Sequence, residues 1–214
     1  MKKKTLYVLI GSIIVLLVIG IVCFIAIPRI DYNYDKNKDC YYVNKVYGNA
    51  KEYEILDEIK GKKVSYIGSR AFADKTRLET IIMGSNITKI ERLAFSNCYE
   101  LKNVDLSKVL IIERNAFMDC ISLESVELGA IDILGGAFYD CKNLKSVTMN
   151  EVESIGSYAF SGTSIEEIIL PETVNLIGKD AFYNCGKLNQ IICYSVQMRI
   201  NEYLLSLGEL VIFM

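Results

Sequence analysis

The sequence predicts a β-rich solenoid with short helical turns, built from about six stacked coils of about 22 residues and preceded by one transmembrane helix. Three observations predict this fold class. An Ala-Phe pair recurs at a near-constant spacing, an alternating apolar segment follows each pair, and an uncharged apolar run lies near the N-terminus. The chain has 214 residues and a formal net charge of −2, which suits one domain with an appendage.

The apolar run covers residues 5–28 and contains no charged side chain, whereas Lys2, Lys3 and Lys4 precede it. A helix of about 20 apolar residues crosses the hydrocarbon core of a bilayer, so this run is long enough to be a transmembrane signal anchor. A cleaved signal would have a shorter apolar region and a small-residue cleavage site. A cleaved signal and a buried soluble helix remain alternatives.

The positive-inside rule gives the orientation of this anchor. It places residues 1–4 in the cytoplasm and the rest of the chain beyond residue 28 outside it. We therefore expect a single-pass membrane protein whose extracytoplasmic domain lies at the cell surface. Residues 29–40 are expected to be a juxtamembrane linker.

The segment over residues 41–66 is expected to form an N-terminal cap and a first partial coil. Its first part alternates apolar and polar positions and contains the turn signal Gly48-Asn49, which together indicate a hairpin-like cap. A solenoid needs such caps because its end coils otherwise expose apolar surface.

The solenoid itself is expected over residues 67–195. The period of the repeat is set by a phenylalanine preceded by alanine, which recurs at Phe72, Phe95, Phe117, Phe138, Phe160 and Phe182. An isoleucine stands five residues earlier in every copy, at Ile67, Ile90, Ile112, Ile133, Ile155 and Ile177. The segment that follows has the form L-x-x-[VI]-x-[LM], as in residues 101–106. A repeat of about 20–29 residues with this segment is the leucine-rich repeat signature, and stacking buries the apolar face of each repeat.

One coil can be traced through its side chains. Val104 and Leu106 point inward while Asn103 and Asp105 point outward, because successive side chains of a strand alternate between its faces. A second short strand ends at the isoleucine, and a tight helical turn then holds the Ala-Phe pair. We expect the phenylalanines to stack inside the solenoid at about 4.8 Å, the spacing of neighbouring strands.

Residues 196–214 are expected to form a C-terminal cap. Apolar spacing predicts a helix over residues 196–207, with Gly208 as its stop, and the remaining segment reads as a last strand.

The repeat "IGSYAFSGTSIEEIILPETVNLIGKDAF", with "YEILDEIKGKKVSYIGSRAF" upstream, resembles the BspA-like leucine-rich repeat family of cell-surface proteins. The resemblance covers roughly residues 41–193. It implies a leucine-rich repeat fold and a cell-surface or secreted binding protein, since some members of the family are associated with adhesion to host proteins or other cells.

Several kinds of site are missing from the sequence. The chain has no histidine, which removes the commonest general base and the commonest zinc ligand. It has no Gly-rich phosphate loop, C-x-x-C pair or EF-hand pattern, and no strong basic field that would attract nucleic acid. We therefore expect no catalytic, cofactor-binding or metal-binding residues, no small-molecule substrate and no nucleic-acid partner. An enzyme that uses paired carboxylates remains a third alternative.

Four cysteines follow a repeat phenylalanine by three residues: Cys98, Cys120, Cys141 and Cys185. Thr163 and Lys75 occupy this position in the other two copies. We expect Cys98, Cys120 and Cys141 to form one buried column of reduced thiols that pack as small apolar groups. A disulfide is an alternative that parallel Cβ vectors disfavour, and a metal column is another.

The candidate partner-binding face consists of two outward columns on the main strands. The first column is Thr80, Asn103, Ser125, Ser146, Glu167 and Gln190, and the second is Ile82, Asp105, Glu127, Thr148, Ile169 and Ile192. Ile169 and Ile192 either form a small apolar patch or merely suit a strand or contact the cap. The preceding column alternates in charge, as Glu79, Lys102, Glu124, Lys145 and Glu166, which fits a charge ladder between coils or a recognition stripe.

The sequence therefore favours a non-catalytic, membrane-anchored, extracytoplasmic leucine-rich repeat protein that binds or adheres to a protein or glycan partner, with the lipid bilayer contacted through residues 5–28. The alternative is a structural or scaffolding envelope protein that acts through lateral contacts with membrane partners.

Overall fold

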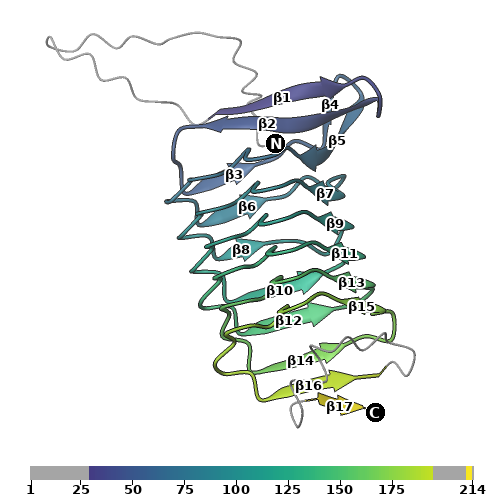
Figure 1. The fold of residues 1–214 in the computed structure, drawn as a ribbon. Coiled ribbons are helices and arrows are strands. Elements are labelled where there is room, and N and C mark those ends of the chain that lie inside the picture. Colours follow the sequence, from purple (N-terminus) through teal and green to yellow (C-terminus); the bar gives the residue numbers. More distant parts are fainter. Residues whose placement is uncertain (1–28, 195–210, 214) are drawn as a thin grey trace, which may run out of the picture.

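The computed structural model describes residues 29–194 and 211–213, and it shows a β-solenoid of stacked coils capped by a hairpin at its N-terminal end (Figure 1). Each coil contributes one strand to each of two walls. The main wall contains β3 (Glu52–Glu54), β6 (Thr80–Ile82), β8 (Asn103–Val104), β10 (Ser125–Leu128), β12 (Ser146–Met149), β14 (Glu167–Leu170), β16 (Gln190–Cys193) and β17 (Val211–Phe213). All the strand pairs within this wall are parallel.

The second wall is one mixed sheet. Its strands are β1 (Arg29–Asp35), β2 (Cys40–Tyr47), β5 (Lys62–Ile67), β7 (Lys89–Ile90), β9 (Ile111–Ile112), β11 (Asp132–Ile133), β13 (Ser154–Ile155) and β15 (Leu176–Ile177), and β4 (Glu58–Ile59) pairs with β5. The repeat isoleucines pair in register from β5 to β15, and all six are fully buried. The isoleucine column predicted from the period is therefore confirmed.

The main wall begins one coil earlier than the sequence predicts. Seven main strands lie between β3 and β16, against about six expected coils. The additional strand is β3, in which Tyr53 pairs with Ile81 of β6 and is buried. The first partial coil thus contributes a full main strand.

A stack of phenylalanine rings fills the interior, as the sequence predicts. Neighbouring rings from Phe72 to Phe160 lie nearly parallel, with centroids 4.8 to 5.3 Å apart, and Phe182 follows at 5.8 Å. Tyr53 closes the N-terminal end of the stack, with its ring edge-on to Phe72 at 5.7 Å. Each ring buries a large apolar area against the coils on either side.

The corner that holds each Ala-Phe pair is not helical, so the expectation of short helical turns is wrong for the described residues. The residues two before and two after each phenylalanine have positive φ: Arg70 and Asp74, Leu93 and Asn97, Asn115 and Asp119, Gly136 and Asp140, Tyr158 and Gly162, Asp180 and Asn184. A left-handed residue cannot continue a right-handed helix. The corner combines short local turns, such as the Ala73 N–H to the Arg70 carbonyl oxygen at 3.1 Å, with bonds to the next coil, such as the Phe72 N–H to the Ala94 carbonyl oxygen at 2.8 Å.

The N-terminal cap also differs from the expected one. A linker is predicted over residues 29–40 and a hairpin around Gly48-Asn49, but β1 pairs antiparallel with β2, and β2 pairs parallel with β5. The chain after β2 is a coil corner, because β2 and β3 belong to different walls. The Tyr66 hydroxyl donates to the Asp35 carboxylate at 2.9 Å, which fixes the hairpin to β5.

Two further predictions concern the ends of the chain. Residues 5–28 and the predicted helix over 196–207 lie outside the described residues. Within the described ranges, no helix is long and apolar enough to span a membrane. The predicted last strand is confirmed by β17, which pairs with β16.

Candidate partner-binding face

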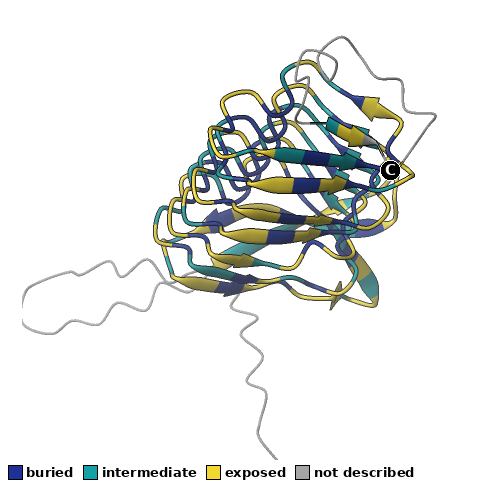
Figure 2. Cartoon of the chain, turned by 90° about the horizontal axis from the view of Figure 1, so that it is seen from below, coloured by how far each residue is buried: buried dark blue, intermediate teal, exposed yellow. Residues whose placement is uncertain are grey.

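All twelve residues of the candidate face lie on the outer side of the main wall. Nine of them are exposed and Thr80, Gln190 and Ile192 are half-buried. The residues between them in β6, β10, β12, β14 and β16 are buried, so the predicted alternation holds, and Figure 2 shows it as changes of colour along the strands. Within each of the sheets β3-β6-β8, β10-β12 and β14-β16-β17, the strands pair in register and so align the outward side chains of successive coils.

The charge column forms ion pairs only at its N-terminal end among the described residues. Glu79 lies between Lys51 and Lys102, and it pairs with both of them. The Nζ of Lys102 lies 3.1 Å from a carboxylate oxygen of Glu79. These cations lower the pKa of the Glu79 carboxyl. The predicted ladder is therefore partly formed, and it does not extend from Lys102 to Glu124.

An apolar row lies at the C-terminal end of the face. Ile169 pairs with Ile192, which pairs in turn with Ile212 of β17. Ile169 is 46% exposed and Ile212 is 40% exposed. The sequence predicts the first two as neighbours but not Ile212, although the alternation in β17 was a usable signal. The row gives this end of the face an apolar character, and Ile82 is a single exposed apolar side chain at the other end.

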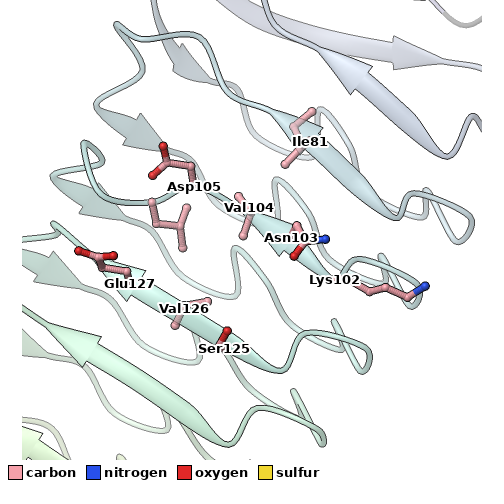
Figure 3. Close-up of a pocket in the computed structure, with 9 residues that line it drawn as sticks. Ile81, Lys102, Asn103, Val104, Asp105, Ser125, Val126 and Glu127 are labelled. Atoms are coloured by element: carbon pink, nitrogen blue, oxygen red, sulfur yellow. The ribbon is translucent and has the colours of Figure 1, made fainter.

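The main wall is split between β8 and β10. The strands β3, β6 and β8 form one sheet, β10 and β12 form another, and pairing across the split is limited to a bridge between Leu106 and Leu128 among the described residues. A second interruption separates β12 from β14. The predicted residues Asn103, Asp105, Ser125 and Glu127 lie along the first split (Figure 3).

The cause of the first split lies in residues 105–107. Asp105 accepts hydrogen bonds from the N–H and the hydroxyl of Ser107, at 3.0 and 2.6 Å, and this local turn ends β8 after two residues. These bonds also lower the pKa of the Asp105 carboxyl. The next coil comes very close at this point, because a Cβ on Gly129 would lie 1.9 Å from the Ser107 carbonyl oxygen. The wall is thus closed at Gly129 and open over the preceding residues.

The cysteines form no site on this face. Cys98, Cys120, Cys141 and Cys185 are buried and free, and each Sγ donates to the carbonyl oxygen of the phenylalanine one coil earlier, at 3.1 to 3.2 Å. The predicted buried and reduced column is confirmed, whereas the hydrogen bonds were not predicted. Across residues 29–194 and 211–213, no cluster of three or more Cys, Asp or Glu side chains is arranged to hold a metal ion.

Lys75 replaces cysteine in the coil next to the cap. Its Nζ donates to the carbonyl oxygen of Gly48 at 2.8 Å, so the side chain ties this corner to the preceding coil. Partial burial lowers the pKa of the Lys75 ammonium. Lys75, like the cysteines at this position, therefore bonds to a backbone carbonyl oxygen of the preceding coil.

Comparisons with known proteins agree with this architecture. The chain resembles the crystal structure of a leucine rich cell surface protein from Faecalibacterium prausnitzii, with a TM-score of 0.64 and 26% identity. The match covers 80% of this chain but only 55% of that one, so the chain spans a little over half of the neighbour's length. A leucine-rich repeat protein of T. pallidum shares the fold, with a TM-score of 0.56, 22% identity and coverage of 76% and 68% of the two chains. No curated protein sequence matches.

The family comparison covers most of the solenoid. The model of the BspA type leucine-rich repeat region matches residues 52–149 and 110–211, with six copies. These ranges include the whole main wall from β3 to β16 and reach the first residue of β17. The chain therefore belongs to the BspA-type leucine-rich repeat family.

Proposed function

We propose that the protein is a non-catalytic, extracytoplasmic binding protein, anchored in the membrane by residues 5–28, that uses the outer side of the main wall to bind a macromolecular partner. The observation that carries this proposal is the placement of twelve outward residues, nine of them exposed, in two columns on one face. Solenoids commonly use such arrays for binding, because stacking makes a continuous surface from short repeats. A protein or a glycan is the expected class of partner.

The composition of the face supports binding rather than catalysis. Its polar residues are mostly small or carry single charges, and its exposed apolar side chains lie at the two ends, Ile82 at one and Ile169 and Ile212 at the other. The buried thiols have raised pKa values, so they are protonated and poor nucleophiles at neutral pH. Cell-surface location is a property of the F. prausnitzii neighbour, and we extend it to this chain because residues 5–28 are apolar and uncharged.

Arrays of proteins and glycans, probed with the full chain in detergent, test the proposal. The informative variant is Ser146→Arg, which puts a long cation in the centre of the face. Ser157→Arg is its matched control, since Ser157 is also exposed but lies at a corner. We expect Ser146→Arg to abolish binding and Ser157→Arg to leave it unchanged. Equal effects of the two variants, or no binding across a broad array, would contradict the proposal.

Membrane anchoring is tested separately. We expect the full chain to remain in the membrane fraction after alkaline carbonate extraction, with a C-terminal tag accessible from outside the cell. Release of the chain into the soluble fraction would remove the anchor from the proposal. Crosslinking in cells distinguishes the scaffolding alternative, which predicts partners in the same membrane only.

A further inference from the structure

We propose that the split between β8 and β10 is a docking groove for an extended peptide segment of a protein partner, which carries a lysine or arginine about three residues from an acidic side chain. This inference rests on the proposed function, because it names the kind of partner and its place on the face.

The groove is an open depression in the outer side of the wall. Its volume is about 420 Å³, and it lies between β8 and β10, which belong to different sheets (Figure 3). Val104 is half-buried in it, whereas Ile81 and Val126, which hold the same position in the neighbouring coils, are buried. The floor therefore offers a small apolar contact between polar rims.

Backbone groups line the groove. Neighbouring residues of a parallel strand bond alternately to the strands on either side. The N–H groups of Lys145 and Asn150 donate to the Glu124 and Leu128 carbonyl oxygens, at 2.9 and 3.3 Å. The backbone groups of Glu124 and Leu128 therefore face β12. Ser125 and Glu127 then turn their backbone groups toward β8, where only the Leu106–Leu128 bridge pairs the strands within the described chain. An extended peptide binds sheets through such groups.

The charges at the two ends of the groove are opposite. Asp105 and Glu127 lie at one end, and within the described residues no lysine or arginine forms an ion pair with either of them. Their hydrogen-bond donors are the neutral residues Ser107 and Asn150. Lys102 lies at the other end and shares the single carboxylate of Glu79 with Lys51, so a positive charge is left over.

This arrangement selects the occupant. Lys102 and Asp105 are three residues apart, about 10 Å along an extended chain. A peptide strand with a cationic and an acidic side chain at the same spacing places each beside the opposite charge, while its backbone meets the open edges. A neutral sugar would offer a counter-charge to neither end of the groove.

The probe is an end-capped fluorescent heptapeptide, Thr-Glu-Val-Thr-Lys-Val-Thr, titrated against the full chain by fluorescence polarisation. A control peptide has glutamine in place of both charged residues, and we expect it to bind at least about fivefold more weakly. Glu127→Lys should weaken binding of the charged peptide by at least about tenfold, and the milder Glu127→Gln by about threefold to fivefold. Glu167→Lys, the same reversal on the same face outside the groove, should leave binding within about twofold.

Amide hydrogen exchange provides a second readout. The peptide should slow exchange at Ser125 and Glu127 and leave Thr148 unchanged, since Thr148 is already paired with β10. Equal losses in Glu127→Lys and Glu167→Lys, or binding without this slowing, would overturn the proposal. So would binding of a neutral trisaccharide that is lost in Glu127→Lys while the peptide fails to bind.

Failure of the groove can be distinguished from failure of the function. If no array partner is found, the proposed function fails. If a partner is lost with Ser146→Arg but is unaffected by Glu127→Lys and by excess peptide, the binding face stands and the groove proposal is wrong.

Discussion

The burial of single side chains inside the coils determines how reactive the cysteines of this protein are. The thiols of Cys98, Cys120 and Cys141 are fully buried, and burial raises the pKa of Cys98 to about 12 and those of the other two well above the ordinary value. A thiol that stays protonated reacts slowly with electrophiles. These cysteines therefore act as packing and hydrogen-bonding groups rather than as nucleophiles.

The raised thiol pKa values predict a loss of stability in alkali. The folded state holds the Cys98 proton up to about pH 12, whereas the unfolded chain releases it from about pH 9, its ordinary value. The contribution is complete below pH 9 and is lost as the pH rises toward 12, with a slope of up to about 1.4 kcal/mol per pH unit for each thiol. Urea unfolding at pH 8 and pH 10.5 measures it. Cys98→Ala should reduce the slope, and an unchanged slope would show that this thiol is not buried as described.

The phenylalanine stack predicts the cost of removing one ring. Phe117→Ala leaves a cavity between Phe95 and Phe138, whose ring centroids lie 5.1 and 5.2 Å from that of Phe117. We expect the free energy of unfolding to fall by about 3–5 kcal/mol. Tyr99→Ala, at a side chain that is 41% exposed, is the control and should change it by less than about 0.5 kcal/mol. Similar losses for both variants would contradict the close packing of Phe117 between its two neighbours.

At the scale of residues, the sequence period predicted a great deal. It placed the isoleucine column, the phenylalanine stack and the thiol column correctly, because stacked repeats turn equal spacing into contact between equivalent residues. It did not predict the thiol hydrogen bonds to the phenylalanine carbonyl oxygens. Those bonds depend on the course of the corner backbone, which residue spacing alone does not determine.

Elements were predicted less well than the columns of equivalent residues. The corners look helical in sequence, but two left-handed residues flank each phenylalanine, and asparagine or aspartate occupies most of the later positions. The segment Arg29–Asp35 alternates apolar and polar residues, which was a usable strand signal, although its pairing with β2 occurs only once and no repeat indicates it. The split after β8 depends on one local turn, at Asp105 and Ser107.

The close approach of the two coils beside this split predicts that replacing Gly129 destabilises the fold. A Cβ on Gly129 would lie 1.9 Å from the Ser107 carbonyl oxygen, so Gly129→Ala must push the two coils apart. We expect a loss of about 1–3 kcal/mol in the free energy of unfolding, measured by urea denaturation. Gly186→Ala is the matched control, because no atom lies within 4 Å of the added Cβ. If Gly129→Ala is as well tolerated as Gly186→Ala, the close approach of these coils is wrong.

At the largest scale, the described chain is a stack of coils whose first coil is covered by the β1–β2 hairpin (Figure 1). The outer side of the main wall carries polar columns, a groove and a short apolar row. The family and the outward columns were predictable, since both follow from the repeat. The groove was not predictable from the repeat, because it forms only where the main strands of two neighbouring coils do not pair. Binding through this wall would leave the corners and the hairpin free.

The most direct test of this account is the footprint of a bound partner. Amide hydrogen exchange of the full chain is measured with and without the partner recovered from the arrays. We predict slower exchange along β8, β10 and β12 of the main wall, and no change at the corners or in β1 and β2. Slowing confined to the corners or to the β1–β2 hairpin, with the main wall unchanged, would contradict the claim that the outer side of this wall is the binding surface.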